Sequence, residues 1–117
     1  VPEFISRATE LVKKEIPDVR PVPFGHLGDG NIHFNLSQPE NADKQEYLSE
    51  WGRINSLVHG LAVNMGGSFS AEHGIGLLKV GDMDSFKQGN EVALMALLKK
   101  ALDPTGTMNP GKVLKSP

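Results

Sequence analysis

Apolar positions along the chain follow helical spacing in three segments. Residues 3–16 carry one apolar stripe at positions i, i+1, i+4, i+7 and i+8, which predicts an amphipathic helix. Residues 41–64 carry a longer stripe of the same kind, and residues 90–102 a shorter one. Asn90 is the expected N-cap of the last helix, because its short side chain can accept a hydrogen bond from a free backbone N–H group. Four residues of that helix are expected to face inward: Leu94, Leu97, Leu98 and Ala101.

The spacing changes to strict alternation between the first two helices. Apolar and polar side chains alternate over residues 31–36, as in a strand with one buried face. The run before it contains Pro21 and Pro23, which restrict it to an edge strand or an extended entry because proline lacks an N–H group. Asp29 and Gly30 lie between the two runs and predict a two-residue type I′ hairpin turn, in which both central residues have positive φ.

The order of these elements predicts an α+β fold. A short strand candidate at residues 68–71 follows the second helix, so the order is helix, hairpin, helix, strand, helix. We expect a small antiparallel sheet with helices packed on one face. The chain has 117 residues, of which 38% are hydrophobic, so it can bury one core. We therefore expect a single domain over residues 1–117.

Composition argues against several classes of function. There are 12 Lys+Arg against 14 Asp+Glu, a formal charge of −2, so no strong positive field favours nucleic acid. Cysteine is absent, which excludes disulfides, thiolate nucleophiles and Cys-ligated metal. No apolar run approaches the roughly 20 residues that span a bilayer. Because the sequence starts with valine close to a predicted helix, we expect it to be part of a longer protein.

The predicted turn brings two histidines together. With Asp29 and Gly30 as the turn residues, His26 pairs with His33 directly opposite, at a Cβ separation of about 4.5–5.5 Å. Two imidazoles at that separation can bind one divalent ion. Asn35 lies two residues from His33 and therefore on the same side of the strand. A single histidine on a strand is more often a surface residue than a ligand, so the facing pair is what favours a metal site.

Glu72 and His73 are the remaining candidates for a site. Neighbouring side chains of an extended chain point to opposite sides, so we expect Glu72 to be the third metal ligand and His73 to transfer a proton. A His-His-Glu set is typical of a catalytic metal that keeps one position open. The alternative is a carboxylate at a helix N-terminus with a neighbouring imidazole. The glycines around these motifs do not match the spacing of dinucleotide-binding or phosphate-binding loops.

Three motifs stand in a fixed order along the chain. They are GHLGDGNIH at residues 25–33, SAEHGIG at residues 70–76, and LDP at residues 102–104 followed by NPGK at residues 109–112. Together they resemble the C-terminal domain of FAD-linked oxidases. This vanillyl-alcohol-oxidase-like family includes D-lactate dehydrogenases, the glycolate oxidase flavin subunit and D-2-hydroxyglutarate dehydrogenase.

The resemblance implies a division of labour between two domains. In this family an N-terminal domain carries the FAD, and the C-terminal domain covers the isoalloxazine and shapes the substrate pocket, so the FAD-binding domain is expected outside this chain. In the metal-dependent, 2-hydroxyglutarate-type members, the residues at His26, His33 and Glu72 bind a divalent ion, often zinc. The family then implies that His73 is the base that takes the hydroxyl proton and that Asn35 contacts the substrate.

The function implied by the resemblance is that of an FAD-dependent dehydrogenase or oxidase of a 2-hydroxy acid, such as D-lactate, glycolate or D-2-hydroxyglutarate. The isolated chain is expected to be inactive. Its expected partners are the small hydroxy acid and the rest of its own enzyme, with a homo-oligomer as a further option, and its expected location is cytoplasmic. Two alternatives stay open: a metal-dependent hydrolase that uses the same three ligands, and a non-catalytic metal-binding or assembly module.

Overall fold

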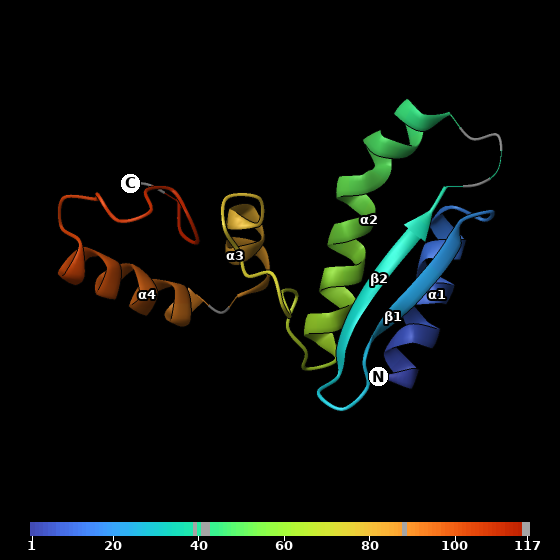
Figure 1. Cartoon of the computed structure of the whole chain (residues 1–117), viewed down its shortest axis with the longest axis horizontal. Coiled ribbons are helices and arrows are strands. Elements are labelled where there is room, and N and C mark those ends of the chain that lie inside the picture. Colours follow the sequence, from blue (N-terminus) through green and yellow to red (C-terminus); the bar gives the residue numbers. More distant parts are fainter. Residues whose placement is uncertain (39, 41–42, 88, 116–117) are drawn as a thin grey trace. The chain divides into compact units, whose positions relative to one another are not determined.

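The computed structural model describes residues 1–38, 40, 43–87 and 89–115. Within these residues, two strands pair antiparallel and four helices accompany them (Figure 1), so the predicted α+β class is confirmed. The chain divides into two compact units, Val1–Glu72 and His73–Pro117. The elements in chain order are α1 (Pro2–Glu15), β1 (Arg20–His26), β2 (Asn31–Ser37), α2 (Lys44–Asn64), α3 (Val80–Phe86) and α4 (Gly89–Leu102).

In the first unit, the two long helices pack on the apolar face of the hairpin. The buried core joins Val12 of α1, Ile54 of α2 and Val19, which directly precedes β1. Phe34 and Leu36 of β2 pack against this cluster, so the apolar side of the alternating pattern faces the helices as predicted. Burying such side chains together is the main source of stability in a unit of this size.

The first turn of α2 is fixed by its polar residues. The Asp43 carboxylate caps the helix by accepting hydrogen bonds from the backbone N–H groups of Gln45 at 2.7 Å and Glu46 at 3.1 Å. The Tyr47 hydroxyl donates to the carbonyl oxygen of Leu36 at 3.0 Å and so ties α2 to β2. The predicted start of this helix, at residues 41 and 42, lies outside the described residues.

The hairpin loop differs from the predicted turn. His26 ends β1, Asn31 begins β2, and these two residues are paired, which leaves residues 27–30 as the loop. The N–H group of Gly30 donates to the carbonyl of His26 at 3.1 Å, and the Asp29 carboxylate accepts from the N–H group of Asn31 at 3.1 Å. A type I′ turn needs positive φ at both Asp29 and Gly30, and of the two only Gly30 has it, at 73°. The predicted two-residue turn is therefore wrong.

The new register moves each strand pair by two residues. Phe24 rather than His26 lies opposite His33, and Ile32 is paired with Gly25 rather than with Leu27, which is exposed in the loop. A slip of one residue would turn every side chain to the other face of the sheet, whereas a slip of two keeps it on the same face. The predicted faces of the hairpin therefore persist although the predicted pairs do not.

Strand β1 contains both prolines of the first run. Pro21 is paired with Leu36 and Pro23 with Phe34, and the sheet has two strands, so β1 is an edge strand as predicted. The predicted third strand at residues 68–71 is wrong, because that segment forms bends. Its hydrogen bonds are local: the Ser68 hydroxyl accepts from the N–H group of Ser70 at 3.2 Å and lies 3.0 Å from its carbonyl. Such local bonds compete with a ladder.

The second unit contains α3 and α4. Helix α4 begins at Gly89, so Asn90 lies in its first turn rather than at the N-cap and accepts a hydrogen bond from the N–H group of Glu91 at 3.0 Å. Helix α3 was not predicted, because seven residues with one buried side chain, Met83, give no helical stripe. None of the helices in the described part of the chain is long and apolar enough to cross a bilayer.

The apolar stripe of α4 does not form a core within its own unit. Met83 and Asp103 are the buried residues in the described part of this unit, which therefore offers the stripe little apolar surface to pack on. The predicted inward orientation of four residues is wrong here, because all of them are exposed: Leu94, Leu97, Leu98 and Ala101.

Candidate functional site

The hairpin gathers the predicted polar residues on one face. In the observed register, His26 is opposite Asn31 and Phe24 is opposite His33, so these side chains share the face opposite to that of Phe34 and Leu36, which pack on the core. Asn35 lies on the same face, as predicted. His26 is a diagonal neighbour of His33, and such neighbours are about 7–8 Å apart, with their Cβ atoms somewhat closer. The expected direct opposition of His26 and His33 is therefore wrong, while their common face is present.

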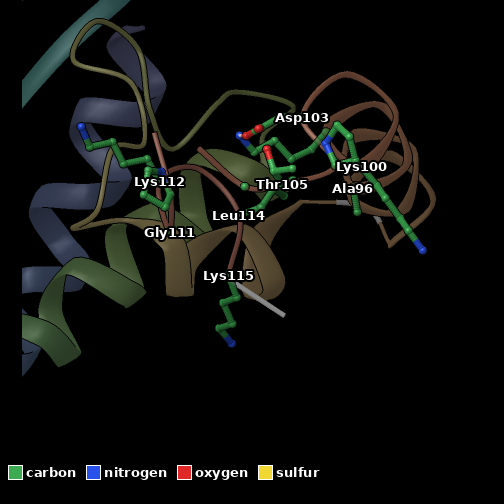
Figure 2. Close-up of a pocket in the computed structure, with 12 residues that line it drawn as sticks. Ala96, Lys100, Asp103, Thr105, Gly111, Lys112, Leu114 and Lys115 are labelled. Carbon is green, nitrogen blue, oxygen red and sulfur yellow. The ribbon is translucent and has the colours of Figure 1, made fainter. Parts of the chain in front are cut away.

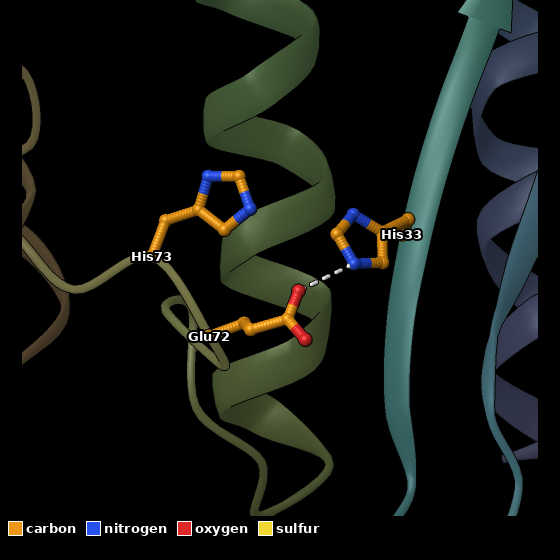
Figure 3. Close-up of side chains that lie close together, drawn as sticks. All are labelled: His33, Glu72 and His73. Carbon is orange, nitrogen blue, oxygen red and sulfur yellow. Dashed lines mark hydrogen bonds and ion pairs between the residues drawn. The ribbon is translucent and has the colours of Figure 1, made fainter.

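Within the first unit, His33 meets a carboxylate from a distant part of the chain. The Nε2 atom of His33 lies 2.9 Å from Oε2 of Glu72, which is 39 residues further along the sequence. The His33 side chain is 31% exposed and that of Glu72 is 44% exposed. Figure 3 shows the Glu72 carboxylate directed at the edge of the His33 ring, where the nitrogen lies. The structure thus brings together two of the three predicted metal ligands.

The separation of these two atoms suits a shared metal ion. Two ligands that each lie about 2.0–2.1 Å from one zinc ion are separated by about 2.9–3.4 Å, depending on the angle between them. The observed 2.9 Å falls in that range. An imidazole nitrogen and a carboxylate oxygen are also ligands that zinc and similar divalent ions prefer. The residues present therefore fit such an ion.

His73 is the first residue of the second unit and follows Glu72 directly in the chain. We expected the side chains of this pair to diverge, since neighbours in a strand point to opposite sides. The segment is bent rather than extended at both residues, so the alternation of side chains along a strand does not apply to it. Strand geometry therefore gives no support to the separate roles predicted for Glu72 and His73.

Phe24 is a site residue that the sequence analysis missed. Its ring stacks on the His33 imidazole, with ring centroids 5.0 Å apart and an interplanar angle of 4°. Pairing across an antiparallel hairpin places the two side chains side by side. With the predicted register, Phe24 would have been opposite Asn35, so only the correct loop length could have revealed this contact.

A second feature that the sequence did not reveal is the network around Asp103, in the second unit. Its carboxylate accepts from the backbone N–H groups of Thr107 and Met108, both at 2.9 Å, and forms an ion pair with Lys99. The hydrogen bond from Lys99 and those from the backbone together lower the pKa of Asp103 to about 2. Asp103 therefore fixes the segment that follows α4.

A groove of about 560 Å³ lies between α4 and that segment, entirely within the second unit. Four lysines are among its lining residues, and Lys99 is engaged by Asp103. In Figure 2 the ammonium groups of Lys100, Lys112 and Lys115 point away from one another. An anion site needs convergent charges, so this groove offers no candidate of that kind.

Comparison with known proteins places the chain in a family. Residues 1–113 match the family described as FAD linked oxidases, C-terminal domain. The chain belongs to this family. The resemblance inferred from the three motifs is thereby confirmed, and the hairpin and the Glu72 segment described above are parts of an FAD-linked oxidase C-terminal domain.

Several relatives carry the name of one enzyme. The chain is 37% identical over 113 residues to a D-2-hydroxyglutarate dehydrogenase of Stutzerimonas stutzeri. The aligned region covers 97% of this chain and 24% of that protein. It is 46% identical over 91 residues to the mitochondrial D-2-hydroxyglutarate dehydrogenase of Arabidopsis thaliana, covering 78% of this chain and 15% of that protein. An uncharacterized FAD-linked oxidoreductase of Mycobacterium tuberculosis is 32% identical over 113 residues, which are 97% of this chain and 23% of that protein. The chain thus spans about a quarter or less of the length of these relatives.

Proposed function

We propose that this chain forms the metal-binding and substrate-binding side of an FAD-dependent dehydrogenase that oxidises a 2-hydroxy acid of the D-2-hydroxyglutarate type. The observation that carries the proposal is the 2.9 Å separation of His33 Nε2 and Glu72 Oε2. It joins an imidazole and a carboxylate from two separate family motifs at one point. Membership of the FAD-linked oxidase family and the names of its relatives support the chemistry.

Three residues would hold a divalent metal ion, with zinc as the first candidate: His26, His33 and Glu72. When bound, the metal would polarise the substrate hydroxyl and orient the substrate carboxylate. His26 would have to reach the ion from its diagonal position on the same face, so its part in the set needs a separate test. Asn35, on that face as well, would donate a hydrogen bond from its amide to the substrate.

The reaction removes a hydride from the substrate Cα and a proton from its hydroxyl, leaving the 2-oxo acid. FAD supplies the hydride acceptor when it is bound. His73 would accept the hydroxyl proton, because a neutral imidazole is a suitable proton acceptor near pH 7. No residue of this chain is assigned to FAD, and we propose that the FAD-binding domain lies in the part of the enzyme that corresponds to the remaining length of the relatives.

The test uses variants of the complete enzyme that carries this sequence, and it distinguishes the proposed metal ligand, Glu72, from the proposed base, His73. Glu72→Gln keeps the shape of the side chain but removes its charge, so bound metal should fall and excess metal should partly restore activity. His73→Ala should keep its metal while kcat falls by about 10²–10⁴-fold, the usual loss when a general base is removed. Elemental analysis measures the bound metal, and steady-state kinetics with D-2-hydroxyglutarate measure kcat. Glu10→Gln, on the exposed side of α1, is the matched control.

Each assignment can fail separately. If His73→Ala loses its metal as completely as Glu72→Gln, His73 is a ligand and the proposed division of roles is wrong. If His26→Ala keeps full metal content, His26 is not part of the set. A complete enzyme that hydrolyses a substrate with these ligands and never reduces its flavin would instead support the hydrolase alternative.

Three further expectations belong to the same proposal. The chain by itself, supplied with FAD, should not reduce a dye acceptor with D-lactate or D-2-hydroxyglutarate. A cytoplasmic location stays a prediction, and some relatives are named as mitochondrial. A homo-oligomer also stays a prediction, which the mass of the purified enzyme in solution would decide.

A further inference from the structure

The His33 imidazole is held from two directions. Its edge approaches Glu72 through Nε2 at 2.9 Å, and its face lies against the ring of Phe24, nearly parallel at 4° and with centroids 5.0 Å apart. Parallel rings at this distance form an offset stack, the favourable geometry for two aromatic groups. Phe24 itself is 54% exposed, so most of its ring is not used to build the core.

The two contacts constrain different motions of the imidazole. The lone pair of an imidazole nitrogen lies in the plane of the ring, so a metal ion must approach from the ring edge. A neighbour stacked on the face leaves that edge open. It opposes rotation about the Cβ–Cγ bond, a torsion with a broad energy minimum that is otherwise poorly defined. Phe24 therefore restricts the plane in which Nε2 can offer its lone pair without competing for the nitrogen.

We infer that Phe24 is a positioning residue, which fixes the ring plane of His33 so that Nε2 points to the place shared with the Glu72 carboxylate. This inference rests on the proposed function in taking that place to be a metal site. The position of Phe24 follows from the backbone, because it is the strand partner of His33 in the register that the four-residue loop imposes. Groups that orient a metal ligand in this way affect metal affinity without touching the ion.

The experiment compares Phe24→Leu, Phe24→Tyr and Leu27→Ala in the complete enzyme. Phe24→Leu keeps an apolar side chain but removes the stack, whereas Phe24→Tyr keeps the stacking ring. Leu27→Ala removes an exposed apolar side chain from the loop of the same hairpin and is the matched control. Zn²⁺ affinity is measured by competition with a chromophoric chelator. In parallel, the resonance of the His33 Cε1 proton is followed in histidine-labelled enzyme and assigned with His33→Gln.

Phe24→Leu should weaken Zn²⁺ binding by about 2- to 10-fold, the equivalent of one aromatic pair. It should also shift the resonance of the His33 Cε1 proton, since that proton loses the ring current of the stacked Phe24 ring. Phe24→Tyr and Leu27→Ala should retain the affinity and the resonance position. Because Phe24 is half exposed, the thermal unfolding temperature should change little, and so a general loss of fold would be recognised.

Two results would overturn the inference: unchanged Zn²⁺ affinity and an unchanged His33 resonance in Phe24→Leu, or equal losses in Phe24→Leu and Phe24→Tyr. Failure of the proposed function has a different signature. If His33→Gln binds Zn²⁺ as tightly as the unaltered enzyme, His33 is not a ligand. The resonance of the His33 Cε1 proton then decides by itself whether Phe24 fixes the ring.

Discussion

Replacing Gly25 by alanine should disturb the hairpin that carries His33. A Cβ atom at Gly25 would lie 2.0 Å from the carbonyl oxygen of Asn31 and 3.0 Å from Cα of Ile32. Both are backbone atoms of β2, so neither can turn aside as a side chain could. The strands must separate by about 1 Å at this point, because ordinary carbon–oxygen contacts are longer than 3 Å.

The size of the effect follows from packing and from backbone conformation. Forcing one extra carbon into a packed position costs about 1–3 kcal/mol, and a backbone obstacle places Gly25→Ala near the upper end. Gly25 also has a φ of 157°, a conformation that residues with side chains rarely adopt, so the entropy gain of a Gly→Ala change does not offset this cost. The free energy of unfolding of the first unit should therefore fall by about 3 kcal/mol. Zn²⁺ affinity should fall as well, because the Phe24–His33 pair adjoins the disturbed position.

Gly28 provides the matched control. It lies in the same loop region, its φ is negative, and a Cβ atom there would meet nothing within 4 Å. Gly28→Ala should therefore leave stability unchanged or raise it by about 0.4–1 kcal/mol. Both variants are measured by guanidinium unfolding followed by far-ultraviolet circular dichroism. A Gly25→Ala variant that unfolds at the same denaturant concentration as Gly28→Ala would refute the observed register, in which Gly25 is paired with Ile32.

Three other changes test the packing and the charges. Ile54→Ala should lower the free energy of unfolding by about 2–5 kcal/mol, because Ile54 is buried in the core of the first unit. Tyr47→Phe should lower it by about 0.5–1.5 kcal/mol through loss of the hydrogen bond to Leu36, measured in the same denaturant series. Because the pKa of Asp103 is lowered to about 2, its ionised form stabilises the second unit above about pH 4, and this contribution is lost as the pH falls to about 2. Asp103→Asn should be less stable than the unaltered chain at pH 6 and should lose less stability between pH 4 and 2, as thermal unfolding at each pH would show.

The parts of the fold that the sequence predicted are those governed by local periodicity. Helix α1 and strand β2 carry one clear apolar face each, and both lie where the pattern placed them. Helix α4 was also placed correctly, but its leucines were expected inside, and periodicity cannot tell which surface an apolar stripe will meet. The bend at residues 68–71 is accompanied by hydrogen bonds between Ser68 and Ser70. Such local bonds offer the backbone an alternative to the hydrogen bonds of a strand.

The candidate site shows the same division between pattern and geometry. The face shared by His33 and Asn35 follows from alternation alone and was predicted. The partner of His33 depends on the loop length, which alternation does not specify. The observed loop has a hydrogen bond from Gly30 to His26 and no positive φ at Asp29. The approach of Glu72 to His33 joins residues 39 positions apart. It was expected from the chemistry of a His-His-Glu ligand set and from the family resemblance, because local spacing does not link residues so far apart in the sequence.

Pro21 and Pro23 leave the outer edge of β1 without two of its amide donors. In an antiparallel pair, alternate residues of a strand direct their N–H groups toward the partner, and the residues between them direct theirs outward. Because proline cannot donate, the ladder to β2 must use the residues on either side of the prolines. An extended segment from another molecule that paired with this edge would lack hydrogen-bond donors opposite two of its carbonyl groups. This edge is therefore a poor template for amyloid-like stacking. Valine at both positions would restore the donors and, with them, the risk of aggregation in concentrated solution.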